Sequence, residues 1–224
     1  MFKRIKRLRL YFFSLLMILT CATIFLFSTE KVNGFILLNI YHTKILDVFF
    51  NIVTNLGDGI LSLLLGIVLI VLRKKKKASC LLLAYASSSL IAQIAKRIFN
   101  LPRPRLLLEQ LNIAYANFVT GVTLHDHHSF PSGHTTSAFA MATVLVLVFK
   151  KNKISTACIL LAIVVGYSRI YLAQHFLLDV LAGAILGTTC ALLSYHQVYD
   201  LKLFRSRKVA KRLKKLRVAT ANSN

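Results

Sequence analysis

Four histidines and an aspartate fall within ten residues of this chain, in the stretch HDHHSFPSGH that ends at His134. Imidazole and carboxylate groups suit metal binding, pH sensing and proton transfer in catalysis. A tetrahedral metal site is disfavoured, because adjacent histidines such as His127 and His128 rarely converge on one ion. We therefore expect His125, Asp126, His127 and His128 to be solvated loop residues, with headgroup binding or pH sensing as the alternative.

Two further polar clusters interrupt an otherwise apolar chain. One reads KRIFNLPRP, from Lys96 to Pro104, and the other reads SRIYLAQHFLLD, from Ser168 to Asp179. So apolar a chain is typical of a membrane protein, in which ionisable side chains at the membrane boundary are energetically costly. The presence of such side chains in these clusters therefore indicates a function. We expect these two clusters and the segment PSGH to converge on one site.

The cations of this site are suited to binding an anion. Lys96, Arg103 and Arg169 supply several N–H donors, and guanidinium forks match the paired oxygens of phosphate. Ser132 and Gly133 are expected at the start of a helix, where a hydroxyl, free backbone N–H groups and the helix dipole favour an anion. The sequence therefore predicts a phosphate-binding site.

The remaining residues suit nucleophilic catalysis. His175 and Asp179 are four residues apart at the predicted start of a helix, so the carboxylate can accept a hydrogen bond from one ring nitrogen. The other nitrogen is then free to attack phosphorus or to take a proton. His134 can protonate the leaving oxygen from the opposite side.

In the three clusters, the pattern KxxxxxxRP, PSGH and SRxxxxxHxxxD resembles the signature of the type 2 phosphatidic acid phosphatase (PAP2) superfamily, with no departure at any signature position. The resemblance implies a metal-independent, cofactor-free phosphatase with a phosphohistidine intermediate on His175, His134 as general acid and Asp179 orienting His175. It also implies phosphate contacts from Lys96, Arg103, Ser132, Gly133 and Arg169.

The resemblance implies a lipid phosphate or diphosphate as the substrate of such a membrane enzyme. Undecaprenyl diphosphate, phosphatidylglycerol phosphate, phosphatidic acid and the phosphates of lipid A fit it equally. A different class of function is a non-catalytic phospholipid-binding or lipid-transport protein that retains the phosphate site. Such a protein is expected to lose His175, His134 or Asp179, and this chain keeps all three.

A membrane bundle can position these clusters, because the chain has 56% hydrophobic residues and only 16% charged ones. An apolar run of about 18 or more residues can cross the roughly 30 Å hydrocarbon layer as a helix. We predict an all-α bundle of six transmembrane helices at Leu10–Phe27, Phe49–Leu72, Ala78–Ile94, Thr135–Phe149, Ile154–Ala173 and Phe176–Tyr195. The fourth run is short, so its helix is expected to begin in the polar loop before it.

The basic residues predict the orientation of this bundle. Of the 29 Lys and Arg residues, 22 fall in Lys3–Arg9, Arg73–Lys77, Lys150–Lys153 and Lys202–Arg217, which share one side of the membrane in a six-helix topology. The positive-inside rule makes that side cytoplasmic, together with both termini. The three clusters then face the outside of the cytoplasmic (inner) membrane. Because topology accounts for most of the positive charge, we expect no nucleic-acid partner.

Residues 1–200 are expected to form a single domain, and residues 201–224 a basic cytoplasmic tail that either lies on anionic lipid or is solvated. A cleaved signal peptide is disfavoured, because the first apolar run is long and no A-x-A-like site follows it. Gly183 and Gly187 form a GxxxG motif, which we assign to close packing within the bundle rather than to dimerisation. Asp58 is predicted to cap a helix, with a role in the site as the alternative.

Overall fold

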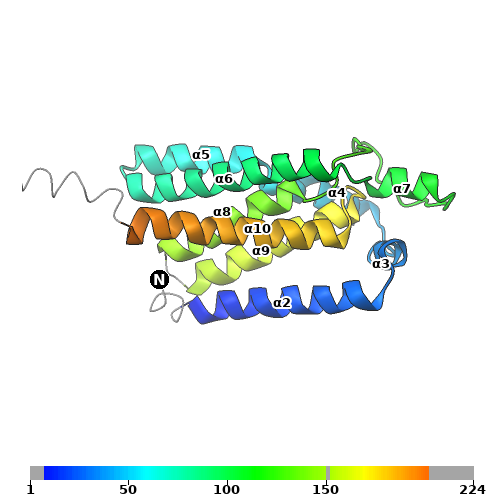
Figure 1. Ribbon diagram of the computed structural model, residues 1–224, viewed down its shortest axis with the longest axis horizontal. Helices are drawn as coiled ribbons and strands as arrows, with labels where there is room; N and C mark the ends of the chain where they lie inside the picture. Colours follow the sequence, from blue (N-terminus) through cyan, green and yellow to red (C-terminus); the bar gives the residue numbers. More distant parts are fainter. Residues whose placement is uncertain (1–7, 150–151, 202–224) are drawn as a thin grey trace, which may run out of the picture.

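The computed structural model describes residues 8–149 and 152–201, and this part of the chain is helical and contains no strand. The elements are α2 (Arg9–Ser28), α3 (Lys31–Leu37), α4 (Lys44–Val53), the 3-10 helix η2 (Thr54–Gly57), α5 (Gly59–Val71), α6 (Lys75–Phe99), α7 (Pro104–Gln110), α8 (Gly133–Phe149), α9 (Asn152–Tyr171), α10 (Leu177–Tyr195) and the π-helix η3 (His196–Asp200). They form an elongated bundle in which α8, α9 and α10 lie between α2 and the α5–α6 pair (Figure 1).

Each of the six predicted membrane spans coincides with a helix or a helix pair. Four segments are long and apolar enough to cross a membrane: Arg9–Ser28, Lys75–Gln110, Ile154–Tyr171 and Leu177–Asp200. The bent pair α4–α5 is a fifth if it counts as one span, and α8, with 17 residues, is shorter. The protein is therefore an all-α, multi-pass membrane protein in the described part of the chain, and the count of six spans stays a prediction.

The second predicted span, Phe49–Leu72, is wrong as one continuous helix. α4 ends at Val53, and after η2 the chain resumes as α5 at an angle of 51°. Asp58 causes the restart, because it has an extended backbone and its carboxylate accepts a hydrogen bond from the N–H of Ile60 at 3.3 Å. The predicted capping role of Asp58 is confirmed.

Helix α10 packs closely on α8 through the two glycines of the GxxxG motif. A Cβ atom on Gly183 would lie 2.7 Å from the carbonyl oxygen of Ser132, and one on Gly187 would meet the carbonyl oxygen of Thr136. Only a residue without a side chain allows the two backbones to approach this closely. The predicted packing role is confirmed, and it holds the start of α10 against the start of α8.

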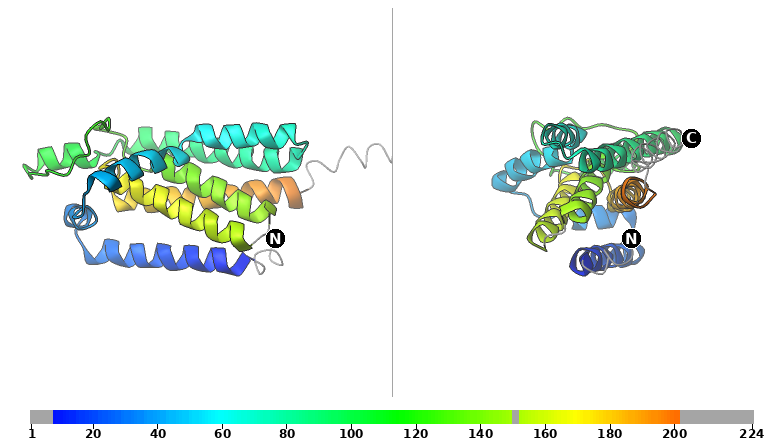
Figure 2. Two further views of the ribbon diagram at one scale, coloured as in Figure 1. Left: turned by 180° about the vertical axis from the view of Figure 1, so that it is seen from behind. Right: turned by 90° about the vertical axis from the view of Figure 1, so that its left-hand side faces the viewer.

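The two ends of the bundle differ in their elements. One end holds the start of α2, the α5–α6 turn and the end of α8, whereas α3, α7 and the loop before α8 lie at the other (Figures 1 and 2). Arg73–Lys77 belong to the first end and the predicted site to the second. This separation agrees with the charge asymmetry, although the cytoplasmic location of the first end stays a prediction. The basic tail from residue 202 onward lies outside the described residues.

The loop segment between α6 and α8 packs on the second end of the bundle. Pro104 opens the short helix α7, where its missing N–H does not break a hydrogen bond. Leu108 of α7 joins an apolar cluster with Phe35 of α3 and Phe176, which directly precedes α10. The cluster fixes the chain on either side of the predicted nucleophile.

Candidate active site

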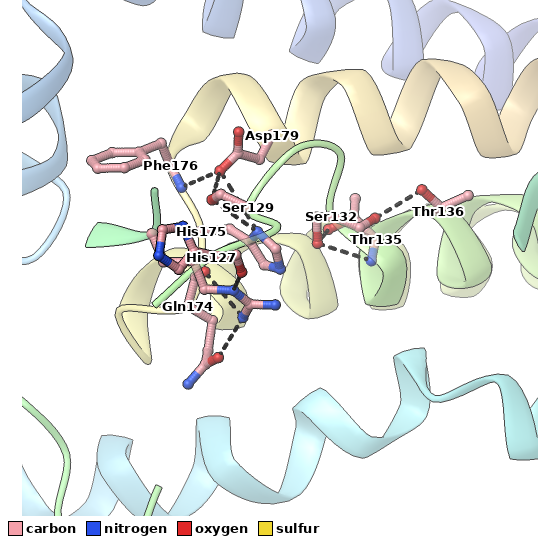
Figure 3. A network of polar contacts seen from close by, with 10 residues as sticks. His127, Ser129, Ser132, Thr135, Thr136, Gln174, His175, Phe176 and Asp179 are labelled. Carbon is pink, nitrogen blue, oxygen red and sulfur yellow. Dashed lines mark hydrogen bonds and ion pairs between the residues drawn. The ribbon is translucent and has the colours of Figure 1, made fainter. Parts of the chain in front are cut away.

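The predicted nucleophile lies in the loop between α9 and α10, two residues before the first residue of α10 and close to the predicted helix start. Helix α10 begins at Leu177, with Phe176 as its N-cap residue. The carboxylate of Asp179 accepts the backbone N–H of Phe176 at 2.9 Å and lies 3.6 Å from Nδ1 of His175 (Figure 3). The carboxylate therefore lies beside Nδ1, slightly beyond hydrogen-bond distance, and the predicted hydrogen bond stays a prediction. Nε2 is the nitrogen left for a substrate.

Ser129 is a third member of this group that the sequence did not reveal. Its hydroxyl donates to Asp179 Oδ2 at 2.5 Å and lies 3.5 Å from Nδ1 of His175 (Figure 3). Ser129 is 1% exposed, and its own N–H donates to the carbonyl of Leu101. The segment before α8 is therefore bonded directly to the carboxylate that orients the nucleophile.

The environment of His175 keeps its imidazole neutral. The side chain is 2% exposed. Burial lowers its pKa to about 3, and the positive charges of Arg103 and Arg169 act in the same direction, against the opposing effect of Asp179. A neutral imidazole retains a lone pair on one nitrogen, as a nucleophile requires.

Arg103 is held in place by neutral acceptors. Its Nε donates to the carbonyl of His127 at 3.0 Å, and its Nη1 donates to Oε1 of Gln174 at 2.8 Å. Gln174 is anchored in turn, because its amide donates to the carbonyl of Thr123 at 3.0 Å. Gln174 lies next to the nucleophile but is not a signature position, so sequence reasoning missed its contact with Arg103.

The stretch from His125 to His128 contributes its backbone more than its side chains. The carbonyls of Asp126 and His127 accept hydrogen bonds from Arg103, and the ring of His128 donates to the carbonyl of Lys96 at 3.0 Å. The side chains of the four residues from His125 to His128 are all exposed, as predicted. In residues 8–149 and 152–201, no group of three or more His, Cys, Asp or Glu residues is placed to hold a metal ion.

Ser132 and Gly133 begin α8, as predicted, but their backbone donors are not all free. The N–H of Ser132 donates to the carbonyl of Asp179 at 3.0 Å, which ties the two helix starts together. The hydroxyl of Ser132 accepts from Thr135 as a helix cap and keeps its own proton as a donor (Figure 3). A Cβ atom on Gly133 would lie 3.7 Å from Nζ of Lys96, so the ammonium group reaches the same helix start.

Arg169, near the end of α9, has a donor directed at no protein atom. The residue is 7% exposed, its Nη1 donates to Oγ1 of Thr54 at 2.6 Å, and its buried Nε has no partner among the described residues. A buried, unpaired N–H costs free energy unless a ligand or water accepts it. His134 interacts electrostatically with Arg169, Lys96 and Arg103, so it shares this charged environment.

The predicted site residues thus come from six segments: the end of α6, the loop before α7, the start of α8, the end of α9, the loop between α9 and α10, and the start of α10. The tertiary contacts described above bring them to one end of the bundle. The arrangement combines a neutral, oriented imidazole with three cations and a helix start. Such a group can bind a phosphoryl group and attack it.

Known proteins with this architecture were identified by comparison. The crystal structure of Aquifex aeolicus LpxE has a TM-score of 0.65 and 36% identity, and the match covers 74% of this chain and 94% of that one. The PAP2-type phosphatidylglycerolphosphate phosphatase from Bacillus subtilis has a TM-score of 0.62 over 91% of this chain and 100% of its own, and its 23% identity supports a common fold alone.

A curated relative, the lipid A 4'-phosphatase of Bacteroides thetaiotaomicron, is 40% identical over 58 residues, which is 26% of each chain. The chain therefore spans about a quarter of that relative's length. The sequence profile of the PAP2 superfamily matches residues 77–203. Since this match covers more than half of the chain and contains every predicted site residue from Lys96 to Asp179, the chain belongs to the PAP2 superfamily.

Proposed function

We propose that this protein is a membrane phosphatase that hydrolyses a lipid phosphate or diphosphate outside the cytoplasmic membrane, through a phosphohistidine on His175. The observation that carries this function is a buried imidazole beside the carboxylate of Asp179 and next to Arg169. The backbone N–H of His175 donates to the carbonyl of Arg169 at 3.0 Å, and the buried Nε of Arg169 is unpaired. A phosphate oxygen would satisfy that donor, and Arg103 and Lys96 would balance the remaining charge.

The reaction has two steps. Nε2 of His175 attacks phosphorus, the bond from phosphorus to the leaving oxygen breaks, and His134 supplies the proton that this oxygen needs. Water then attacks the phosphohistidine and gives a proton back to His134, the N–P bond breaks, and inorganic phosphate leaves. The cations stabilise the charge that spreads over the phosphoryl oxygens in both steps, which is the dominant requirement in phosphoryl transfer.

An open apolar groove on the surface of the bundle favours a lipid as the substrate. It has a volume of about 530 Å³ and lies between α2 and the start of α10, where Leu177 contributes to its wall. Leu177 follows the nucleophile by two residues in the sequence, so we infer that a chain in this groove approaches the end of the bundle that carries the phosphoryl site. Met17, Ile18, Cys21, Ala22, Phe25 and Leu38 complete the lining.

Purified protein in detergent is expected to release phosphate from at least one of four lipids in the presence of EDTA. The panel is undecaprenyl diphosphate, phosphatidylglycerol phosphate, phosphatidic acid and a lipid A phosphate. Activity should survive chelation, because Lys96, Arg103 and Arg169 supply the positive charge that Mg²⁺ provides elsewhere. Loss of activity with EDTA and recovery with a divalent ion would show a metal requirement. Tight lipid binding without phosphate release would favour the non-catalytic alternative.

The proposed orientation is tested by labelling two exposed positions at opposite ends of the bundle. In intact cells, a membrane-impermeant maleimide should modify Thr120→Cys, in the loop before α8, and leave Lys75→Cys, at the start of α6, unmodified until the cells are opened. Both are compared with the parent chain, because Cys21 is also exposed. Labelling of Lys75→Cys alone in intact cells would place the site on the cytoplasmic side.

A further inference from the structure

The buried guanidinium of Arg169 is held by a residue outside the three sequence motifs. Its Nη1 donates to Oγ1 of Thr54 at 2.6 Å, and Thr54 is 6% exposed. The two residues are 115 positions apart in the chain. Among the described residues, the bond to Thr54 is the one that positions the guanidinium, because the Nε donor of Arg169 has no partner. The position of the guanidinium therefore depends on Thr54.

Thr54 lies in the break between α4 and α5, and this break contacts the site at a second point. A Cβ atom on Gly57 would lie 2.9 Å from the carbonyl oxygen of His134 and 2.6 Å from Cγ1 of Val165 in α9. The backbone of η2 therefore lies against the predicted general acid and against the helix that carries Arg169. Interrupted helices in membrane proteins are tolerated where they line a cavity or a binding site.

The chemistry of the acceptor matters as much as its position. A hydroxyl oxygen satisfies one N–H of the guanidinium without cancelling its charge, whereas a carboxylate would neutralise the arginine. Arg103 is held in the same way, by an amide oxygen and a backbone carbonyl. Both arginines thus keep their full positive charge for a ligand while their orientation is fixed in advance.

We propose that the helix break Thr54–Gly57 is a fourth component of the active site and that Thr54 is a positioning residue for Arg169. The Thr54 hydroxyl fixes the plane of the guanidinium so that its unpaired donor meets the phosphoryl group in the transition state. This role rests on the proposed function, because it concerns how an existing phosphoryl site is aligned. Thr54 itself does not touch the substrate.

The test compares Thr54→Val, which keeps the shape but removes the acceptor, with Thr54→Ser, which keeps the acceptor. Thr54→Val should lower kcat by about 10-fold to 100-fold, because a small misplacement of a charge-stabilising group has an effect of that order. KM should change little, and the inhibition constant for orthovanadate, which mimics the transferring phosphoryl group, should rise by a similar factor. Thr54→Ser should stay close to wild type in all three quantities.

Thr43→Val is the matched control. Thr54 follows the last residue of α4, whereas Thr43 precedes the same helix as its N-cap, and the Thr43 hydroxyl accepts from the N–H of Leu46 at 3.2 Å. The same substitution there removes a hydrogen bond within the helix and none to the site. It should lower the thermal midpoint of unfolding and leave kcat unchanged, which separates a loss of helix stability from a loss of alignment.

A double-mutant cycle tests whether Thr54 acts through Arg169. In an Arg169→Lys background, Thr54→Val should cause no further loss of kcat. Equal losses in Thr54→Val and Thr54→Ser, multiplicative losses in the cycle, or a Thr54→Val enzyme within twofold of wild type would each overturn the role of Thr54. If Thr54→Val does not fold, Thr54→Ala takes its place in the same comparison with Thr54→Ser. A wild-type protein that releases no phosphate from the lipid panel would refute the proposed function instead.

Discussion

Replacing His175 with alanine is expected to reduce phosphate release by on the order of 10⁴-fold or more on every substrate. The imidazole is buried, oriented by Asp179 and neutral, because burial lowers its pKa to about 3. It can therefore act as a nucleophile throughout the usual assay range of pH. An alanine at this position leaves no atom to accept the phosphoryl group, so the loss should be independent of the leaving group.

A rapid-quench experiment with a lipid labelled in its phosphate measures this directly. Acid-labile, protein-bound phosphate should appear in the wild type and be missing in His175→Ala, while lipid binding persists through Arg103 and Arg169. His125→Ala is the matched control, since this histidine is exposed, lies in the loop before α8 and should retain full activity. Labelled phosphate trapped on His175→Ala would mean that another residue is the nucleophile.

The sequence was sufficient for the parts of the site that depend on short-range spacing. Asp179 lies close enough to His175 to orient it because both flank the start of one helix. Ser132 and Gly133 open α8 because a serine cap precedes the apolar run. In each case the relevant contact is made within a few residues, where backbone geometry restricts the possible arrangements.

Contacts between distant segments were not predictable, because they depend on how the helices pack. The partners of the site residues include Ser129 for Asp179, Gln174 for Arg103 and Thr54 for Arg169, at separations of 50, 71 and 115 residues. Ser, Gln and Thr also occur commonly on surfaces, so their residue types gave no signal. The placement of Ser129 two residues before the PSGH segment was the nearest hint.

The break in the second span was missed for a physical reason. A hydropathy window averages over about 19 residues, so the short polar stretch around Asn55 and Asp58 is hidden by the apolar residues on both sides. The signals were nonetheless local: Gly57 and Gly59 weaken a helix, and Asp58 favours the start of a new one. Polar and glycine residues inside an apolar run therefore mark the place where a span can bend toward a site.

Replacing His134 with alanine is expected to slow phosphohistidine formation by on the order of 10² to 10⁴-fold with a lipid alkyl phosphate. His134 lies in the first turn of α8, against the η2 backbone and within the field of Lys96, Arg103 and Arg169. We assign it the proton that the leaving oxygen receives as its bond to phosphorus breaks. Burial and the three cations disfavour that proton in the free enzyme, so we expect the bound phosphate, which is an anion, to favour protonation of His134. An alkoxide is a poor leaving group without that proton, because its conjugate acid is very weak.

The size of the loss should therefore depend on the leaving group, which distinguishes His134 from His175. With p-nitrophenyl phosphate the phenolate departs without a proton, so His134→Ala should slow phosphohistidine formation far less than with the lipid. Rapid-quench measurement follows this first step alone. The comparison therefore does not include any role of His134 in the later attack by water. His175→Ala should abolish the step with both substrates. If His134→Ala slows the step by the same factor with both substrates, the proton of His134 does not go to the leaving oxygen.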